Sequence, residues 1–396
     1  MRVIAKSNRG KMGKMLSWLC VVGMLFVTAC GGTGNQPEGE ILADKEMQTG
    51  IETQSGNTAQ SGQDAQDSAG AQQTSADQKG ATEASMEQGT KVTPEQNPTE
   101  IRVGSLKGPT TMGIVNLMKK AENGETVDKY ELTMATAADE ISAKLVSGDL
   151  DIALVPANLA SVLYNKTQGK VSVIDINTLG VLYCVTTDDS IHSVKDLAGK
   201  TVITTGQGTT PEYALRTLLE RSGVTDCNLE FKSEATEVAA LLKDGTAQIG
   251  VLPQPFVTAA MLQNDALKTA FSLSEEWDRL DDSSHLVTGV TVVRAAFLAE
   301  HADAVGRFVT EHKASAEQAN ADIEGTAQLV AEYGIIEKAP VAAKAIPNCN
   351  LVCITGDEMQ AALSGYLDTL YAQNPQAVGG TLPGTDFYVV ELDLTE

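Results

Sequence analysis

Hydrophobic and polar positions follow the same order in two separate parts of the chain. In 137–156, apolar residues at helical spacing lead to Gly148 and then to a short apolar run that stops at Pro156. The same order recurs in 234–253, which ends at Pro253. Helical periodicity that gives way to a glycine and a short apolar run predicts a helix followed by a strand.

Each repeat is preceded by another strand, loop and helix, in 100–120 and in 200–223. The order β-α-β-α-β therefore occurs twice, which predicts two α/β lobes with mostly parallel sheets. The apolar stretches 179–189 and 285–294 are predicted to be strands that cross between the lobes. The predicted division is lobe one in 99–185 and 290–396, and lobe two in 186–289.

The N-terminus has the pattern of a secretory signal peptide, which we assign to residues 1–29. This segment contains five basic residues, no acidic residue and an apolar run that ends just before Cys30. The run is shorter than the roughly 20 apolar residues that cross a bilayer. Val27-Thr28-Ala29-Cys30 resembles the lipobox of bacterial lipoproteins, although Val27 replaces the usual leucine. That resemblance implies that Cys30 is lipidated, with palmitate among its acyl chains.

Residues 30–98 are rich in Gly, Ser, Thr, Gln and Ala, and no aromatic residue occurs between Phe26 and Tyr130. Such a segment buries too little apolar surface to offset the entropy of ordering it. We interpret it as a flexible tether, with a binding tail as the alternative. Signal, lipidated cysteine and tether together predict a protein anchored by lipid on the extracytoplasmic face of the cell membrane.

Composition disfavours several classes of function. The formal net charge is −23, which makes nucleic acid and anionic membrane surfaces poor partners. Four cysteines follow Cys30, without CxxC or Cys/His metal-ligand spacing, and are predicted to be buried thiols, with disulfides as the alternative in an exported protein. The four histidines form no HExxH pair, and no GxSxG motif occurs. The chain is therefore predicted to be no enzyme and to hold no metal or cofactor.

The candidate binding residues lie in four loops that follow the repeated strands. In open α/β sheets ligands bind beyond the carboxyl ends of the strands, and they favour domain interfaces. The loops are 105–112, 156–159, 206–211 and 253–256. Their candidate residues, with one aromatic from the crossover strand, are Lys107, Gly108, Thr110, Thr111, Pro156, Asn158, Tyr183, Gly206, Gly208, Thr209, Thr210, Pro253 and Gln254.

Each candidate also has a plain structural interpretation, and the residues alone leave both open. The glycines and threonines of 206–211, with Pro211 after them, suit an anion at a helix N-terminus or merely a capped helix. Lys107 is either a point charge for an anionic group or a solvated lysine. Asn158 is either a ligand contact or an N-cap, and Tyr183 either stacks on a planar ligand or belongs to the core.

Two short motifs carry a family resemblance. Asp196-Leu197-Ala198-Gly199-Lys200 leads into a strand, and Pro253-Gln254-Pro255-Phe256 ends one. With the lipobox and the paired lobes, these motifs resemble the substrate-binding lipoproteins of ABC importers, in the family that binds sulfonates, nitrate and pyrimidine precursors of thiamine. Gln254 replaces an acidic residue that is usual in that family, so a contact made by that acid is not implied here.

The resemblance implies a two-lobed, type II periplasmic-binding-protein-like fold with two crossover strands. It implies a monomer that captures a small organic molecule between the lobes and delivers it to a membrane permease and its ATPase. The alternatives are a two-lobed enzyme of the thiamine-precursor type and a sensor or surface lipoprotein without a transport role. A small anionic or heteroaromatic organic molecule is the predicted class of ligand, and the motifs do not distinguish among the ligands of the family.

Overall fold

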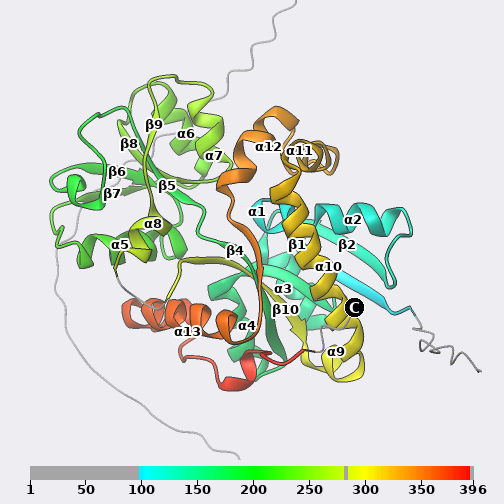
Figure 1. Cartoon of the computed structure of the whole chain (residues 1–396). Coiled ribbons are helices and arrows are strands. Elements are labelled where there is room, and N and C mark those ends of the chain that lie inside the picture. Colours follow the sequence, from blue (N-terminus) through cyan, green and yellow to red (C-terminus); the bar gives the residue numbers. More distant parts are fainter. Residues whose placement is uncertain (1–97, 281–283, 393–396) are drawn as a thin grey trace, which may run out of the picture. The chain divides into compact units, whose positions relative to one another are not determined.

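The computed structural model describes residues 98–280 and 284–392, and two β-sheets with their helices form this part of the chain (Figure 1). The signal peptide, Cys30 and nearly all of the tether lie outside the described residues. In the described part, no helix has the length and apolar character needed to cross a membrane.

The first sheet has six strands in the order β11-β4-β10-β3-β1-β2. Their bounds are β1 Glu100–Leu106, β2 Lys129–Ala135, β3 Ile152–Pro156, β4 Val171–Leu179, β10 Val287–Arg294 and β11 Leu351–Ile354. The second sheet has five strands in the order β7-β6-β8-β5-β9. Their bounds are β5 Leu182–Thr186, β6 Thr201–Thr204, β7 Asn228–Phe231, β8 Ile249–Pro253 and β9 Lys268–Ser272.

Helices connect and cover both sheets (Figure 1). The α-helices are α1 Pro109–Met112, α2 Val115–Glu122, α3 Ala138–Ser147, α4 Ala157–Thr167, α5 Thr210–Arg221, α6 Ala235–Lys243, α7 Phe256–Met261, α8 Leu273–Asp278, α9 Ala295–Glu300, α10 Ala302–Ala321, α11 Ile323–Glu332, α12 Ala339–Ala345 and α13 Gly356–Gln373. Short 3₁₀ helices are η1 Val194–Leu197, η2 Ile346–Asn348, η3 Pro375–Val378 and η4 Thr385–Phe387.

The repeated pattern folds in both places as the periodicity predicts. In the first copy α3 ends at Gly148, whose φ of 88° is left-handed, and β3 follows. In the second copy α6 precedes Gly245, with φ 76°, and then β8. A glycine tolerates this conformation at no steric cost, so it ends the helix and turns the chain back toward the sheet. The helix and strand expected in each repeat are confirmed.

The expectation of mostly parallel sheets is wrong. β1 pairs in parallel with β2 and β3, and β6 with β7 and β8. However, β10 is antiparallel to β3 and β4, and β5 is antiparallel to β8 and β9. The strands of each repeat follow one another within one sheet. β5 and β10 instead follow elements that belong with the other sheet, and they run in the opposite direction.

The chain passes between the sheets where the predicted crossover strands lie. β4 of the first sheet ends at Leu179, and β5 of the second begins at Leu182. Gly180 lies between them, and a side chain there would meet Ser274 and Leu286. A glycine is therefore needed at this close approach. The exact limits of the two lobes stay a prediction.

The hydrophobic core includes contacts between elements of both sheets. Trp277 of α8 is fully buried, and its ring lies edge-on to Tyr366 of α13 at 6.0 Å between centroids. Its Nε1 donates to Ser284 Oγ at 3.1 Å. Trp277 is thus a packing residue with a satisfied indole N–H, and α13 shares its core with α8 as well as with β4 and α4.

Candidate functional site

The loop after β1 holds its two threonines against the end of its own strand. The hydroxyls of Thr110 and Thr111 both donate to the carbonyl of Leu106, Thr110 at 3.0 Å. Thr111 Oγ1 also lies 2.7 Å from Ser105 Oγ, and both residues are fully buried. These hydroxyls therefore fix the loop. Gly108 precedes α1 with φ 146°, and Lys107 next to it is exposed.

The residues after β3 contact the C-terminal part of the chain. Pro156 pairs with Gly289 of β10, and α4 begins at the next residue. Asn158 is the second residue of α4, not its N-cap, and its Nδ2 donates to the carbonyl of Ala377 at 3.4 Å. The N-cap alternative for Asn158 is wrong, because Pro156 occupies that position. Contact of either residue with a ligand stays a prediction.

The loop after β6 is closed by a carboxylate of its own helix. Gly206 and Gly208 have φ values of 75° and 73°, and Thr209 Oγ1 donates to the carbonyl of Gly206 at 2.7 Å. The N–H of Gly208 donates to Glu212 Oε2 at 2.6 Å. Glu212 therefore occupies a position at which the sequence suggested an external anion.

Electrostatics at this helix start follow from Glu212. Burial alone would raise the pKa of Glu212, but the Gly208 N–H and the Arg216 guanidinium, 2.7 Å away, hold that pKa below its ordinary value. The carboxylate is charged at neutral pH, which weakens attraction of a second anion to Gly208. Thr210 faces another element, because its Oγ1 accepts from the hydroxyl of Tyr366 on α13 at 3.3 Å.

Tyr183 and Gln254 line one cavity of about 570 Å³. Most of its other lining residues come from α7, β9, α8 and the C-terminal segment that contains α12 and η2. Tyr183 lies on β5, and its hydroxyl donates to the carbonyl of Asn348 in η2 at 2.9 Å. Burial, with smaller effects of Cys349 and Glu275, raises the pKa of Tyr183 to about 12. The phenol is therefore neutral and can donate a hydrogen bond at physiological pH.

Gln254 lies where β8 ends and is almost fully buried. Its Oε1 accepts from Thr258 Oγ1 at 2.9 Å, which fixes the side chain at the start of α7. The remaining cavity wall combines apolar and polar groups. The wall residues are Val257, Thr258, Met261, Leu262, Thr269, Ala270, Phe271, Ser272, Glu275, Lys344 and Asn348.

The structure thus groups two of the predicted residues and separates others from them. Gly208 lines a different groove, beside Gln373 and Asn374 at the end of α13. The residues that the sequence did not suggest are Glu275, Lys344 and Asn348. Lys344 and Asn348 lie in a C-terminal segment outside the repeats, so no periodic signal marked them. Lys344 supplies the cavity with a cation, and Glu275 supplies an anion.

Comparison with known proteins identifies the fold of the chain. Residues 168–324 match the model of the NMT1/THI5-like family. A structure described as an ABC transporter from Parabacteroides distasonis has a TM-score of 0.64 and 24% identity, and the match covers 73% of this chain and 98% of that one. The chain has the two-lobed fold of type II periplasmic binding proteins. The fold suggested by the sequence motifs is thereby confirmed, and the match over 168–324 agrees with the family resemblance.

Two sulfonate-binding proteins share this fold at greater sequence distance. The periplasmic aliphatic sulphonate binding protein SsuA from Escherichia coli has a TM-score of 0.58 and 15% identity, over 72% of this chain and 91% of that one. The alkanesulfonate-binding protein SsuA from Xanthomonas axonopodis pv. citri, bound to MOPS, has a TM-score of 0.53 and 15% identity, over 70% and 94%. A search of curated proteins found no match.

Proposed function

We propose that the protein is the solute-binding component of an ABC importer, anchored outside the membrane by lipid on Cys30. In this proposal it captures a small organic molecule between the lobes 99–185 with 290–396 and 186–289, as a monomer and without catalysis. It then delivers the molecule to a permease driven by an ATPase. The observation that carries the proposal is the cavity in which Tyr183 and Gln254, next to the second sheet, face Lys344 and Asn348.

The cavity has the size of a small-molecule site, and its wall is about equally polar and apolar. Pockets for small ligands are mostly apolar, about 300–1,000 Å³ in volume, and carry a few polar groups that fix orientation. Here Val257, Met261 and Phe271 supply apolar wall, and Tyr183 and Gln254 supply polar groups that are already held in place. Held groups lose little conformational entropy when a ligand binds.

The charged residues of the cavity narrow the class of solute that we expect it to bind. Glu275 and Lys344 both line the cavity, so it offers one anion and one cation. A zwitterionic or heteroaromatic molecule with hydrogen-bonding groups matches this arrangement better than a simple anion. This sharpens the expectation from the sequence, which allowed sulfonates equally.

Contacts between the C-terminal region and the second sheet with its helices suggest how binding is coupled to delivery. Tyr183 is bonded to Asn348, and Thr210 to Tyr366, in each case between an element of the second sheet and the C-terminal region. The chain crosses between the sheets at Gly180 and again before β10. Closure about these two crossings would let a permease distinguish a loaded from an empty protein.

Native mass spectrometry of the purified protein, followed by a thermal-shift panel, tests the proposal. The panel contains alkanesulfonates, pyrimidines and zwitterionic amines. A ligand at 100 times its Kd should add about 2.7 kcal/mol to the free energy of unfolding. Tyr183→Ala should abolish that shift, whereas Tyr164→Phe, which removes an exposed hydroxyl bonded to Asp386, should retain it. Equal shifts in both variants would place the ligand elsewhere, and no bound compound in either assay would count against a solute receptor.

A further inference from the structure

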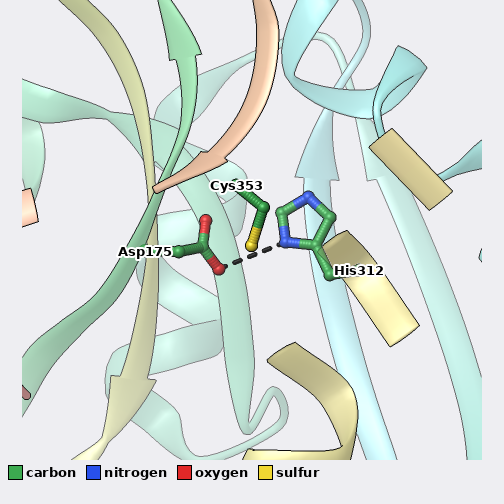
Figure 2. A group of neighbouring side chains, drawn as sticks. All are labelled: Asp175, His312 and Cys353. Carbon is green, nitrogen blue, oxygen red and sulfur yellow. Dashed lines mark hydrogen bonds and ion pairs between the residues drawn. The ribbon is translucent and has the colours of Figure 1, made fainter. Parts of the chain in front are cut away.

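Three side chains that can bind metal meet beside the first sheet (Figure 2), and none of them lines the Tyr183 cavity. Asp175 lies on β4, His312 on α10 and Cys353 on β11. One ligand atom from each residue lies within 4.8 Å of the other two. Figure 2 shows the Cys353 thiol pointing toward the hydrogen bond between Asp175 and His312. A carboxylate, an imidazole and a thiol from three elements thus share one small space.

The distances resemble those of a tetrahedral metal centre. Asp175 Oδ2 and His312 Nδ1 are 3.1 Å apart. Two ligands about 2.0–2.1 Å from Zn²⁺ at the tetrahedral angle would lie about 3.3 Å apart. The Asp175–His312 pair therefore already has nearly the spacing that a shared ion requires. Asp175 Oδ1 accepts from Thr291 Oγ1 at 2.7 Å, and such a bond to the outer oxygen is a usual way to orient a ligating carboxylate.

The hydrogen bonds in the cluster leave polar atoms without good partners. Asp175 and His312 are both fully buried, and His312 Nε2 has no hydrogen-bond partner among the described residues. The Cys353 thiol has only a 3.8 Å contact with the carbonyl of Val309. Nδ1, not Nε2, faces the cluster, so coordination through Nδ1 would leave Nε2 as it is. A metal at the cluster would instead give the poorly bonded thiol of Cys353 a strong partner.

A local irregularity of β11 brings Cys353 to the cluster. Leu351 pairs with Thr178 and Ile354 with Ile176, so β11 contains one residue more than β4 between the same two pairs. An extra residue of this kind bends an edge strand and redirects its side chains. Cys353 is also the only member of the cluster that is partly accessible to solvent. It therefore marks the side from which an ion would enter.

We propose that Asp175, His312 and Cys353 form a binding site for a borderline-soft divalent metal of the Zn²⁺ class. The mixed oxygen, nitrogen and sulfur ligands favour such an ion over Mg²⁺ or Ca²⁺, which take oxygen ligands. Cys353 binds as thiolate and releases its proton to solvent. A site with three protein ligands takes water as the fourth. The ion ties α10 and β11 to β4, beside the edge of the first sheet.

The test is metal binding to the full chain after chelator treatment and dialysis. We expect one equivalent of Zn²⁺, and Co²⁺ in its place should give a thiolate-to-metal absorption band in the near ultraviolet. Cys353→Ser should remove that band and lower Zn²⁺ affinity by at least about 10–100-fold, since even outer-shell changes have effects of that size. Circular dichroism of the same samples separates loss of a ligand from loss of the fold.

Two control variants remove the same kinds of side chain, a thiol and an imidazole, at positions outside the cluster. Cys227→Ser removes a partly buried thiol elsewhere, and His285→Gln removes an exposed imidazole bonded to Asp278 at 3.0 Å. Both should retain one equivalent of metal and the Co²⁺ band. If the wild-type chain binds no metal, or binds it equally well as Cys353→Ser, then the cluster is only a hydrogen-bonded network and the proposal is wrong. His312→Gln should behave as Cys353→Ser does.

Discussion

The loop after β1 and the loop after β6 occupy equivalent places in the two lobes, yet they present opposite charges. In the first, Thr110 and Thr111 are bonded to Leu106, and Lys107 is exposed. In the second, the Gly208 N–H is bonded to the carboxylate of Glu212. A helix start attracts anions through its free N–H groups and its dipole. Where the helix provides its own carboxylate, as α5 does with Glu212, this group takes the place of an external anion. The attraction for a second anion is then weaker.

The comparison teaches that two loops with similar glycine and threonine content can present opposite charges. The first loop is fixed by buried hydroxyls and leaves a cation at its surface. The second is fixed by left-handed glycines and a carboxylate. If both loops contribute to the proposed site, a solute that is positive or neutral toward Glu212 and negative toward Lys107 fits them best. The following variants test each part of this difference.

Gly206→Ala should have the largest effect. Gly206 has φ 75°, and an added Cβ would lie 2.5 Å from Thr209 Oγ1 and 2.8 Å from Pro211 Cγ. The left-handed backbone costs about 1–2 kcal/mol and the clash about 1–3 kcal/mol, so we expect a loss of about 2–5 kcal/mol by urea unfolding. Gly208→Ala is the matched control, because its φ is 73° but no atom lies within 4 Å of the added Cβ. Equal losses would show that the contacts at Gly206 are unimportant.

Thr111→Val should have the next largest effect and tests the hydroxyls of the first loop. The valine keeps the shape but removes the bonds to Ser105 and Leu106 in a fully buried place. An unsatisfied buried polar group costs about 1–3 kcal/mol, which urea unfolding measures. Thr167→Val is a useful control, since its hydroxyl bonds a carbonyl four residues earlier in α4 at a partly exposed site. A loss no larger than in the control would contradict the role given to Thr111.

The sequence predicted the local elements well because their signals are local. The helix before Gly148 and the strand that ends at Pro156 follow from spacing and one glycine. Thr209 and Glu212 also have capping-box spacing, although the carboxylate bonds Gly208 here. Even this bond therefore had a signal, one that we interpreted as a site for an external anion.

What the sequence did not predict depends on residues that are distant along the chain. A strand pattern of period two does not encode its partner, so the antiparallel pairing of β5 and β10 was missed. Lys344 reaches the Tyr183 cavity from a segment with no repeat. Asp175, His312 and Cys353 meet only because β4, α10 and β11 pack together. No spacing rule connects such residues.

Glu212→Gln should have a smaller effect that depends on pH. The folded-state pKa of Glu212 is lowered, so its stabilisation is present above the ordinary carboxyl pKa and is lost as pH falls through the lower folded value. Near neutral pH we expect a loss of about 0.5–1.5 kcal/mol. The difference from wild type should shrink below about pH 4. Urea unfolding at several pH values measures this, and a difference that is constant with pH would argue against a charged bond to Gly208.

Lys107→Gln should have the smallest effect on stability and a visible effect on ligand choice. Lys107 is exposed and forms no ion pair among the described residues, so its loss should change the free energy of unfolding by less than about 0.5 kcal/mol. If the first loop contacts the solute, a ligand with a negative group should bind several-fold more weakly, whereas Glu212→Gln should bind it more tightly. Isothermal titration of both variants with the ligand found by native mass spectrometry compares them directly. Changes in the same direction would mean that the two loops do not act as oppositely charged sides of one site.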